Sequence, residues 1–260
     1  FKNYKLVTAV APSEYGIIEE MRKERASGWS PAKPSHRIFR KYIRRESGQP
    51  FPACIGQSRP FYCRCTLKDE NAHIFHLGSL LADDFPLEVV KELAQKGTLQ
   101  SMHKLSPESG RWTRIPCRLA WKEESLKYID ILKVNEHEAE VLTGFKDPEK
   151  AAKQLAQWGV KEVLLTLGSL GSLIYAEGKF YKIPAYAPKE VVDATGCGDT
   201  YVLGYLYMRN KGASYAEAGC FAAAMSTIKL EKSGPFSGTE EEVWHILKNN
   251  KQKPEVLVAQ

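Results

Sequence analysis

The densest group of residues that could do chemistry is the run Asp-Ala-Thr-Gly-Cys-Gly-Asp at positions 193–199. Gly196 and Gly198 flank Cys197 where an extended segment is expected to turn into a helix. Successive backbone N–H groups at a helix N-terminus form a concave anion site, which the helix dipole also favours. Asp199 is electrostatically unexpected there, unless it removes a proton from a nucleophile beside a transferring phosphoryl group. A simple helix cap would explain Asp199 but not the whole run.

A second candidate site follows an apolar strand. Asn135 and Glu138 stand three residues apart in the first turn of an expected helix at 136–143. At this spacing both side chains can face one hydrated cation such as Mg²⁺, with Glu138 as a surface carboxylate. Asparagine and glutamate are also good helix-capping residues, so the pair indicates a metal site only together with the downstream aspartate motif.

The elements that must position these residues alternate steadily along the chain. Hydrophobic periodicity predicts strands at 5–10, 73–77, 129–134, 163–167, 173–175 and 180–183, the last two joined as a hairpin across Glu177-Gly178. Helices are predicted at 15–22, 86–96, 136–143, 198–209 and 214–229, with another between Asp147 and Gly159 and a last one capped by Thr239. Strands that alternate with helices predict an α/β fold with a mainly parallel sheet and helices on both faces.

Composition fits an ordinary globular protein. Of the 260 residues, 43% are hydrophobic and 26% charged, which excludes disorder, collagen and coiled coil for the chain as a whole. No apolar run approaches the ~18 residues that a membrane-spanning helix needs. The six cysteines are too sparse for a disulfide scaffold in a chain of this length. We expect one domain over residues 1–260, in a reducing, cytoplasmic setting.

The run at 193–206 resembles the second signature of the ribokinase-like (pfkB) carbohydrate kinases, which reads Asp-Thr-x-Gly-Ala-Gly-Asp before a helix of small residues. Ala194 and Cys197 replace the usual Thr and Ala, and both are small. The segment 130–144 resembles the family's Asn-x-x-Glu motif, and 163–171 resembles the strand and turn that border ATP. The resemblance implies a ribokinase-like α/β fold, here with the small β lid absent or incomplete.

The resemblance also implies an activity, the ATP-dependent transfer of the γ-phosphate to a sugar hydroxyl. It makes Asp199 the general base and assigns an anion hole to the backbone amides of Gly196, Cys197 and Gly198. It implies nucleotide contacts at Asn135, Thr166, Gly168 and Gly171. It also implies Mg²⁺ bound through water at Asn135 and Glu138, and a monovalent cation at Asp193. Phosphoryl transfer depends on such placement and charge stabilisation. A nucleoside kinase of the same family and a catalytically impaired nucleotide-binding protein remain as alternatives.

Two stretches, 21–68 and 98–118, carry no family pattern and are expected to be irregular. The first has twelve Lys and Arg against two acids, a local net charge of +10, which leaves −4 for the rest of a chain with net charge +6. Such a stretch could bind a polyanion, but no RNA-binding motif or zinc-finger spacing accompanies it, which favours a solvated segment. Local slippage of the reading frame is a further hypothesis for both stretches.

The acceptor site cannot be assigned, because the family residues that hold the sugar would precede Phe1. We therefore expect the chain to bind ATP with Mg²⁺, to hydrolyse it slowly and to phosphorylate free sugars poorly. The expected partners are ATP and a small sugar, without membrane or nucleic acid. A homodimer is left open.

Overall fold

The computed structural model describes residues 72–78, 87–102, 119–250 and 252–259, together with four short strands nearer the N-terminus. The chain divides into two compact units. The smaller comprises Phe1–Glu70 with Asp83–Val89, and the larger comprises Asn71–Ala82 with Val90–Gln260. The expectation of a single domain stays a prediction.

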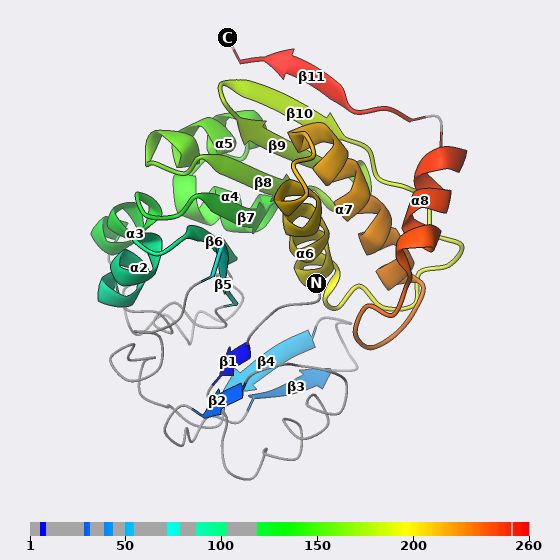
Figure 1. Ribbon diagram of the computed structural model, residues 1–260, viewed down its shortest axis with the longest axis horizontal. Coiled ribbons are helices and arrows are strands. Elements are labelled where there is room, and N and C mark those ends of the chain that lie inside the picture. Colours follow the sequence, from blue (N-terminus) through cyan, green and yellow to red (C-terminus); the bar gives the residue numbers. More distant parts are fainter. Residues whose placement is uncertain are drawn as a thin grey trace. The chain divides into compact units, whose positions relative to one another are not determined.

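The larger unit is built around a seven-stranded sheet in the order β11-β10-β9-β8-β7-β6-β5 (Figure 1). The strands are β5 (Ile74–Leu77), β6 (Thr98–Met102), β7 (Ile131–Asn135), β8 (Glu162–Thr166), β9 (Ser172–Ala176), β10 (Lys179–Ile183) and β11 (Glu255–Val258). Strands β5 to β8 pair in parallel, whereas β8 to β11 pair antiparallel. The α/β class is confirmed, but the sheet is mixed rather than mainly parallel. The short turn between β9 and β10 can join only antiparallel neighbours, and β11 adds an antiparallel edge strand after α8.

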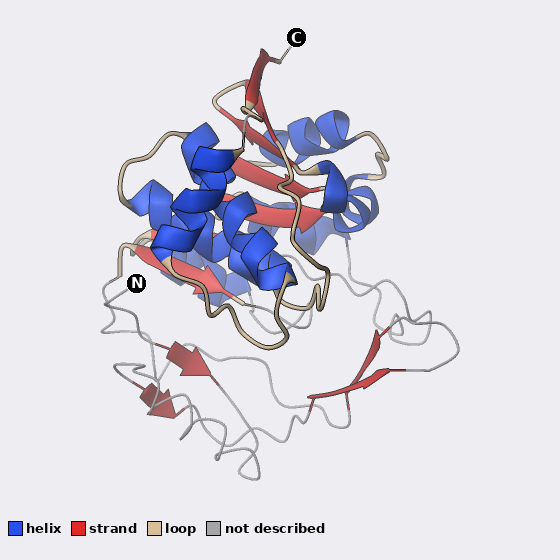
Figure 2. Ribbon diagram, turned by 90° about the vertical axis from the view of Figure 1, so that its right-hand side faces the viewer, coloured by secondary structure: helices blue, strands red, loops and turns tan. Residues whose placement is uncertain are grey.

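Helices cover both faces of this sheet, α6 and α7 on one and α4 and α5 on the other (Figure 2). The helices of the chain are α2 (Leu87–Ala94), α3 (Leu119–Leu126), α4 (Glu136–Thr143), α5 (Pro148–Gln157), α6 (Cys197–Asn210), α7 (Tyr215–Leu230) and α8 (Glu240–Asn249), with a 3₁₀ turn η3 at Gly168–Leu170. Leu164 and Ile174 pack against Tyr205 and Phe221 of α6 and α7 in one buried cluster. Successive side chains of a strand point to opposite faces of the sheet, so the residues next to Leu164 and Ile174 face the other side.

The ends of several helices have caps formed by residue types that favour those positions. Ser214 and Thr239 form capping boxes at the start of α7 and α8, and Asp147 accepts a hydrogen bond from the Lys150 amide at the start of α5. Gly144 ends α4 in the left-handed conformation, with φ of 78°. The hairpin between β9 and β10 turns at Glu177 and Gly178, both with positive φ. Local sequence therefore determines these boundaries.

Several predicted elements differ in the structure. Thr98–Met102 was expected to be irregular but forms β6, parallel to β5 and β7 on either side. The edge strand β11 was not predicted, because its residues stay largely exposed; Val258, for example, is 74% exposed. The predicted helix at 15–22 and the stretch 103–118 lie outside the described residues.

The smaller unit contains two pairs of strands. β1 (Leu6–Thr8) lies within the predicted strand and pairs in parallel with β2 (Trp29–Pro31). β3 (Phe39–Ile43) pairs antiparallel with β4 (Pro50–Cys54). The expectation that 21–68 is irregular is therefore wrong for β2, β3 and β4, whereas the expectation about the β lid stays a prediction. Over the described part of the chain, no helix has the length and apolar character to cross a membrane.

Candidate functional site

The aspartate motif forms the predicted turn from an extended segment into a helix. Gly196 adopts φ of 84° immediately before α6, a left-handed conformation that glycine adopts without strain. The carboxylate of Asp193 accepts a hydrogen bond from the Thr195 amide at 2.9 Å, which stabilises the preceding bend. Asp199 lies in the first turn of α6, where backbone N–H groups have no partner within the helix. The turn thus has the geometry of an anion site.

The three amides assigned to the anion hole are not equivalent. The Cys197 N–H donates to the carbonyl of Ala194 at 3.2 Å and so stabilises the turn itself. Gly198 lies one residue further into the first turn of α6, where the N–H points along the helix axis toward the N-terminus. The anion-hole assignment stays a prediction, and the geometry favours Gly198 over Cys197 as the donor.

Helix α7 contacts the turn before α6 and stabilises it. The Ser226 hydroxyl donates to the Cys197 carbonyl at 3.2 Å, and the Val192 amide donates to the carbonyl of Leu230 at 2.8 Å. Burial raises the pKa of the Cys197 thiol, and the nearby ammonium of Lys229 partly opposes that rise. The turn is therefore fixed mainly by contacts to the end of α7.

Asn135 and Glu138 form a capping box at the start of α4. The Asn135 side chain accepts from the Glu138 amide at 2.8 Å, and the Glu138 carboxylate accepts from the Asn135 amide at 2.7 Å. Glu138 is only 7% exposed, so the expectation of a surface carboxylate is wrong. The burial follows from the turn of the side chain back over the helix N-terminus.

Lys133 brings the two motifs together and was missed by the sequence analysis. Its ammonium lies 3.9 Å from the Glu138 carboxylate, and both side chains are almost fully buried. A Cβ built on Gly198 would lie 2.9 Å from the same ammonium, so Lys133 contacts the first turn of α6. The only signal in the sequence is one lysine within the buried run of β7.

The predicted nucleotide-binding residues of β8 and η3 separate into two groups. Thr166 is the register partner of Asn135 on the neighbouring strand, so these two residues lie side by side at the end of the parallel strands. Gly168 has φ of 57° and open space where a Cβ would stand. By contrast, a Cβ on Gly171 would clash with the backbone of Ile183. Packing of the fold alone therefore explains the glycine at 171.

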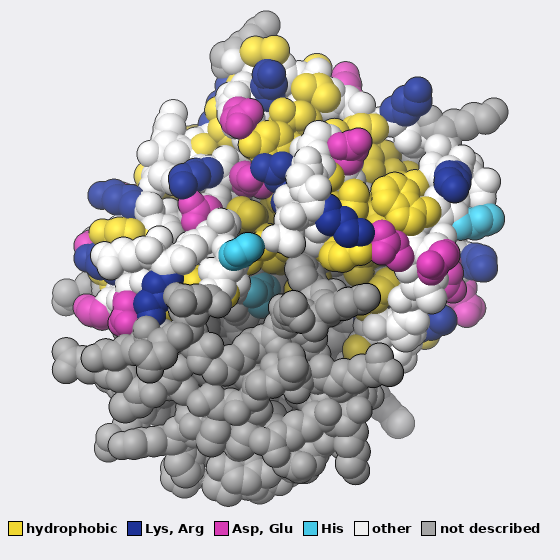
Figure 3. Space-filling model, in the orientation of Figure 1, with side chains coloured by type: hydrophobic (Ala, Val, Ile, Leu, Met, Phe, Trp, Pro, Cys, Tyr) yellow, Lys and Arg dark blue, Asp and Glu magenta, His cyan; other side chains and the backbone are white. Residues whose placement is uncertain are grey.

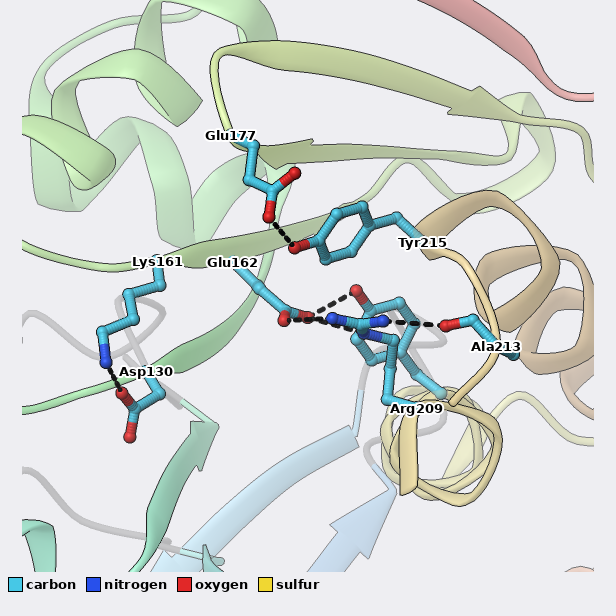
Figure 4. A network of polar contacts seen from close by, with 8 residues as sticks. Asp130, Lys161, Glu162, Glu177, Arg209, Ala213 and Tyr215 are labelled. Atoms are coloured by element: carbon cyan, nitrogen blue, oxygen red, sulfur yellow. Dashed lines mark hydrogen bonds and ion pairs between the residues drawn. The ribbon is translucent and has the colours of Figure 1, made fainter. Parts of the chain in front are cut away.

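The far end of α6 is fixed by a network of charged and phenolic groups (Figure 4). Arg209 donates to the Glu162 carboxylate at 2.9 Å and to the carbonyl of Ala213 at 2.7 Å. Tyr205 donates to the same carboxylate at 2.6 Å. Burial and the adjacent carboxylate raise the pKa of Tyr205, while burial and Glu177 raise the pKa of Tyr215 to about 12. These contacts hold the C-terminal end of α6, the end opposite Asp199.

The arrangement is compatible with a Mg²⁺ ion held mainly by water and phosphate. Over the described ranges, no group of three or more His, Cys, Asp or Glu side chains could hold a metal ion. Mg²⁺ typically keeps several waters and takes one or two protein carboxylates plus substrate phosphates. Asn135 and Glu138 offer oxygen atoms of this kind, although both are engaged in the capping box. Their assignment to Mg²⁺ stays a prediction.

A helix N-terminus that carries a carboxylate, next to a lysine and polar groups at the ends of parallel strands, is typical of α/β phosphotransferases. The chain belongs to the pfkB family of carbohydrate kinases, whose sequence profile matches residues 66–242. The predicted family resemblance is confirmed.

Relatives within this family act on different acceptors. Over 152 residues the chain is 32% identical to a cytidine kinase of Thermococcus kodakarensis. This aligned stretch covers 54% of this chain and 54% of the kinase. Over 186 residues it is 31% identical to a ribokinase of Arabidopsis thaliana. This aligned stretch covers 68% of this chain and 46% of the ribokinase. The chain therefore spans about half the length of the curated relatives it matches.

The fold is also that of solved ribokinase structures. Arabidopsis thaliana ribokinase complexed with ribose and ATP matches with a TM-score of 0.71 at 24% identity, over 94% of this chain and 81% of that chain. At this level of identity the likeness establishes the fold. It confirms the ribokinase-like α/β architecture.

Proposed function

We propose that the protein is an ATP-dependent phosphotransferase that phosphorylates a hydroxyl group of a sugar or nucleoside. The observation that carries the proposal is the place of Asp199, in the first turn of α6 and next to Gly198, which Lys133 contacts. One small region thus offers a proton acceptor, backbone N–H donors and a buried positive charge. These are the groups that phosphoryl transfer requires.

The chemistry assigns one role to each group. The acceptor hydroxyl attacks the γ-phosphorus of ATP, its proton passes to the carboxylate of Asp199, and the bond to the bridging oxygen breaks to release ADP. The N–H groups of the first turn of α6 and the ammonium of Lys133 stabilise the negative charge on the phosphoryl oxygens. Asn135 and Glu138 would hold Mg²⁺ through water, and the ion would neutralise further negative charge on the phosphates.

The names of the two relatives narrow the acceptor. Ribose and cytidine share a ribose ring, and two of the proteins that the chain resembles are a ribokinase and a cytidine kinase. We therefore assign a ribose hydroxyl, free or in a nucleoside, as the acceptor. On the face drawn in Figure 3, described side chains of both charges are interspersed, which suits a small substrate better than a polyanion.

The experiment is a coupled assay of ADP release with ATP and Mg²⁺, in which ribose, cytidine and other sugars and nucleosides are added one at a time. A ribose-containing acceptor is expected to raise ADP release above the background hydrolysis of ATP, and a rate below the usual kinase range of about 1–100 s⁻¹ would agree with the expected poor phosphorylation of free sugars. If no acceptor raises ADP release above the background hydrolysis of ATP, the proposed function is wrong. If only a sugar without a ribose ring does so, the assignment of the acceptor is wrong.

A further inference from the structure

Lys229 is a buried lysine near the C-terminal end of α7 that the proposed reaction does not use. Its residue surface is 2% exposed, and lysine is almost never fully buried unless it is paired. The ammonium donates one hydrogen bond to the carbonyl of Asp193 at 3.2 Å and another to the carbonyl of Lys232 at 2.9 Å. Burial of a charged group is costly unless it is well paired, so these contacts need an explanation beyond the packing of α7.

The acceptors of Lys229 are backbone carbonyls, which are also the ligands that proteins use for potassium ions. The resemblance to the family implies a monovalent cation near Asp193. In the structure the Asp193 carbonyl already accepts a hydrogen bond from the Lys229 ammonium. A free monovalent cation therefore does not fit at this carbonyl, because it would meet a buried charge of the same sign.

The position of Lys229 gives the ammonium a direct influence on the anion site. A Cβ built on Gly196 would lie 3.7 Å from Lys229 Cε, so the side chain runs directly beneath the turn before α6. The electrostatic effect of Lys229 on the Cys197 thiol places the positive charge near the start of the helix. The side chain thus bridges the two segments that meet at this turn, one ending at Asp193 and the other following α7.

We propose that the Lys229 ammonium is a tethered cation that replaces a monovalent ion at Asp193. It holds the anion-binding turn in place and supplies a fixed positive charge beneath it, so that the protein binds phosphate groups without K⁺ or Na⁺. The nucleotide part of this inference rests on the proposed function. The ion-binding part does not, because it concerns only the occupancy of the carbonyl site.

The first experiment uses the unmodified protein. Binding of ATP with Mg²⁺ is measured by calorimetry, and the melting temperature without nucleotide is measured in parallel, each in KCl and in choline chloride at equal ionic strength. Choline is too large for a carbonyl site. Both quantities are expected to be the same in the two salts. A melting temperature or an affinity that depends on K⁺ would overturn the inference.

The second experiment compares two substitutions that differ in the space they leave. Lys229→Ala removes the ammonium and leaves room for an ion, whereas Lys229→Met removes the charge but fills the space. Loss of two charge-assisted hydrogen bonds is expected to weaken nucleotide binding about tenfold or more in both variants. Added K⁺ is expected to restore binding in Lys229→Ala but not in Lys229→Met. Equal behaviour of the two variants in KCl would contradict the inference.

A matched control and a direct view of the ion complete the test. Lys248→Met removes an exposed lysine from α8 and should change neither the affinity nor its response to K⁺. In crystals soaked in RbCl, anomalous density for Rb⁺ is expected beside the Asp193 carbonyl in Lys229→Ala and not in the unmodified protein. Rb⁺ at this position in the unmodified protein would overturn the inference. This result is independent of nucleotide binding, so it separates a failure here from a failure of the proposed function.

Discussion

The two ends of α6 are held in different ways. At the C-terminal end, side chains meet side chains, because Arg209 and Tyr205 both bind the carboxylate of Glu162. At the N-terminal end, α7 holds the preceding turn largely through backbone carbonyls, and the first turn contains Gly198 and Asp199. The first end is satisfied within the protein, and the second directs backbone donors outward. The comparison indicates that one end fixes the helix and the other serves a ligand.

The largest effect is expected at the ligand end. Asp199→Asn keeps the shape of the side chain but cannot accept a proton, so turnover should fall by about 10²–10⁴ while ATP affinity changes little. Steady-state rates and calorimetry measure the two quantities. Asp147→Asn, at the exposed N-cap of α5, is the matched control and should retain turnover. Turnover of Asp199→Asn within a few-fold of the unmodified protein would exclude a general-base role.

The second largest effect, on stability, is expected at the C-terminal end of α6. Arg209→Met removes the guanidinium from a partly buried pair and keeps the hydrogen bond from Tyr205 to Glu162. Loss of hydrogen bonds to a charged group should lower the free energy of unfolding by about 1.5–3 kcal/mol. Denaturant unfolding measures this, and nucleotide affinity in the folded protein should change little. Lys161→Met, which removes an exposed partner of Asp130, should cost much less. A large loss of affinity without loss of stability would contradict the proposed division of roles.

A smaller effect is expected at the start of α4. Glu138→Gln weakens the capping box and the contact with Lys133, and should lower the free energy of unfolding by about 0.5–2 kcal/mol. If Glu138 also holds Mg²⁺ through water, the Mg²⁺ concentration for half-maximal nucleotide binding should rise. The control is Glu242→Gln in the capping box of α8, which should lower stability without changing the Mg²⁺ requirement. An unchanged Mg²⁺ requirement in Glu138→Gln would reduce Glu138 to a structural cap.

The smallest effect is chemical. Because burial raises the pKa of Cys197, less of this thiol is ionised at a given pH than of a free thiol. Alkylation by iodoacetamide at pH 8, followed by peptide mass spectrometry, should therefore be several-fold slower at Cys197 than in glutathione. Bound ATP should slow it further, because Cys197 is in the turn before Asp199. A rate equal to that of glutathione would show that the turn is open.

Local signals in the sequence predicted much of the fold between residues 129 and 249. Helix α4 has the predicted bounds, and the capping boxes and hairpin turn are as expected, because each depends on residues close together in the chain. β6 was missed because Thr98–Met102 shows no alternation of polar and apolar residues. Gln100 is fully buried there and contacts His76 on the neighbouring strand. His76 is 24 residues away from Gln100 in the sequence, so no local pattern predicts this contact.

The site shows the same division. The aspartate motif and the Asn-x-x-Glu pair are contiguous in sequence and were found, although the burial of Glu138 was not. Lys133 stands in the apolar run of β7 and Lys229 lies between Ile228 and Leu230, and at neither position does the sequence distinguish a buried ammonium from one that reaches solvent. Their importance follows from contacts to Gly198 and Asp193, which only the folded chain brings near.

The central claim is that the N-terminal end of α6 binds the phosphate groups of the nucleotide. The most direct measurement is a titration with ATP and Mg²⁺ followed by the backbone amide resonances of ¹⁵N-labelled protein. The account predicts that the amides of Gly198 and Asp199 shift strongly, while those around Arg209 at the other end remain nearly unchanged. Saturable binding that leaves Gly198 and Asp199 unshifted would contradict it.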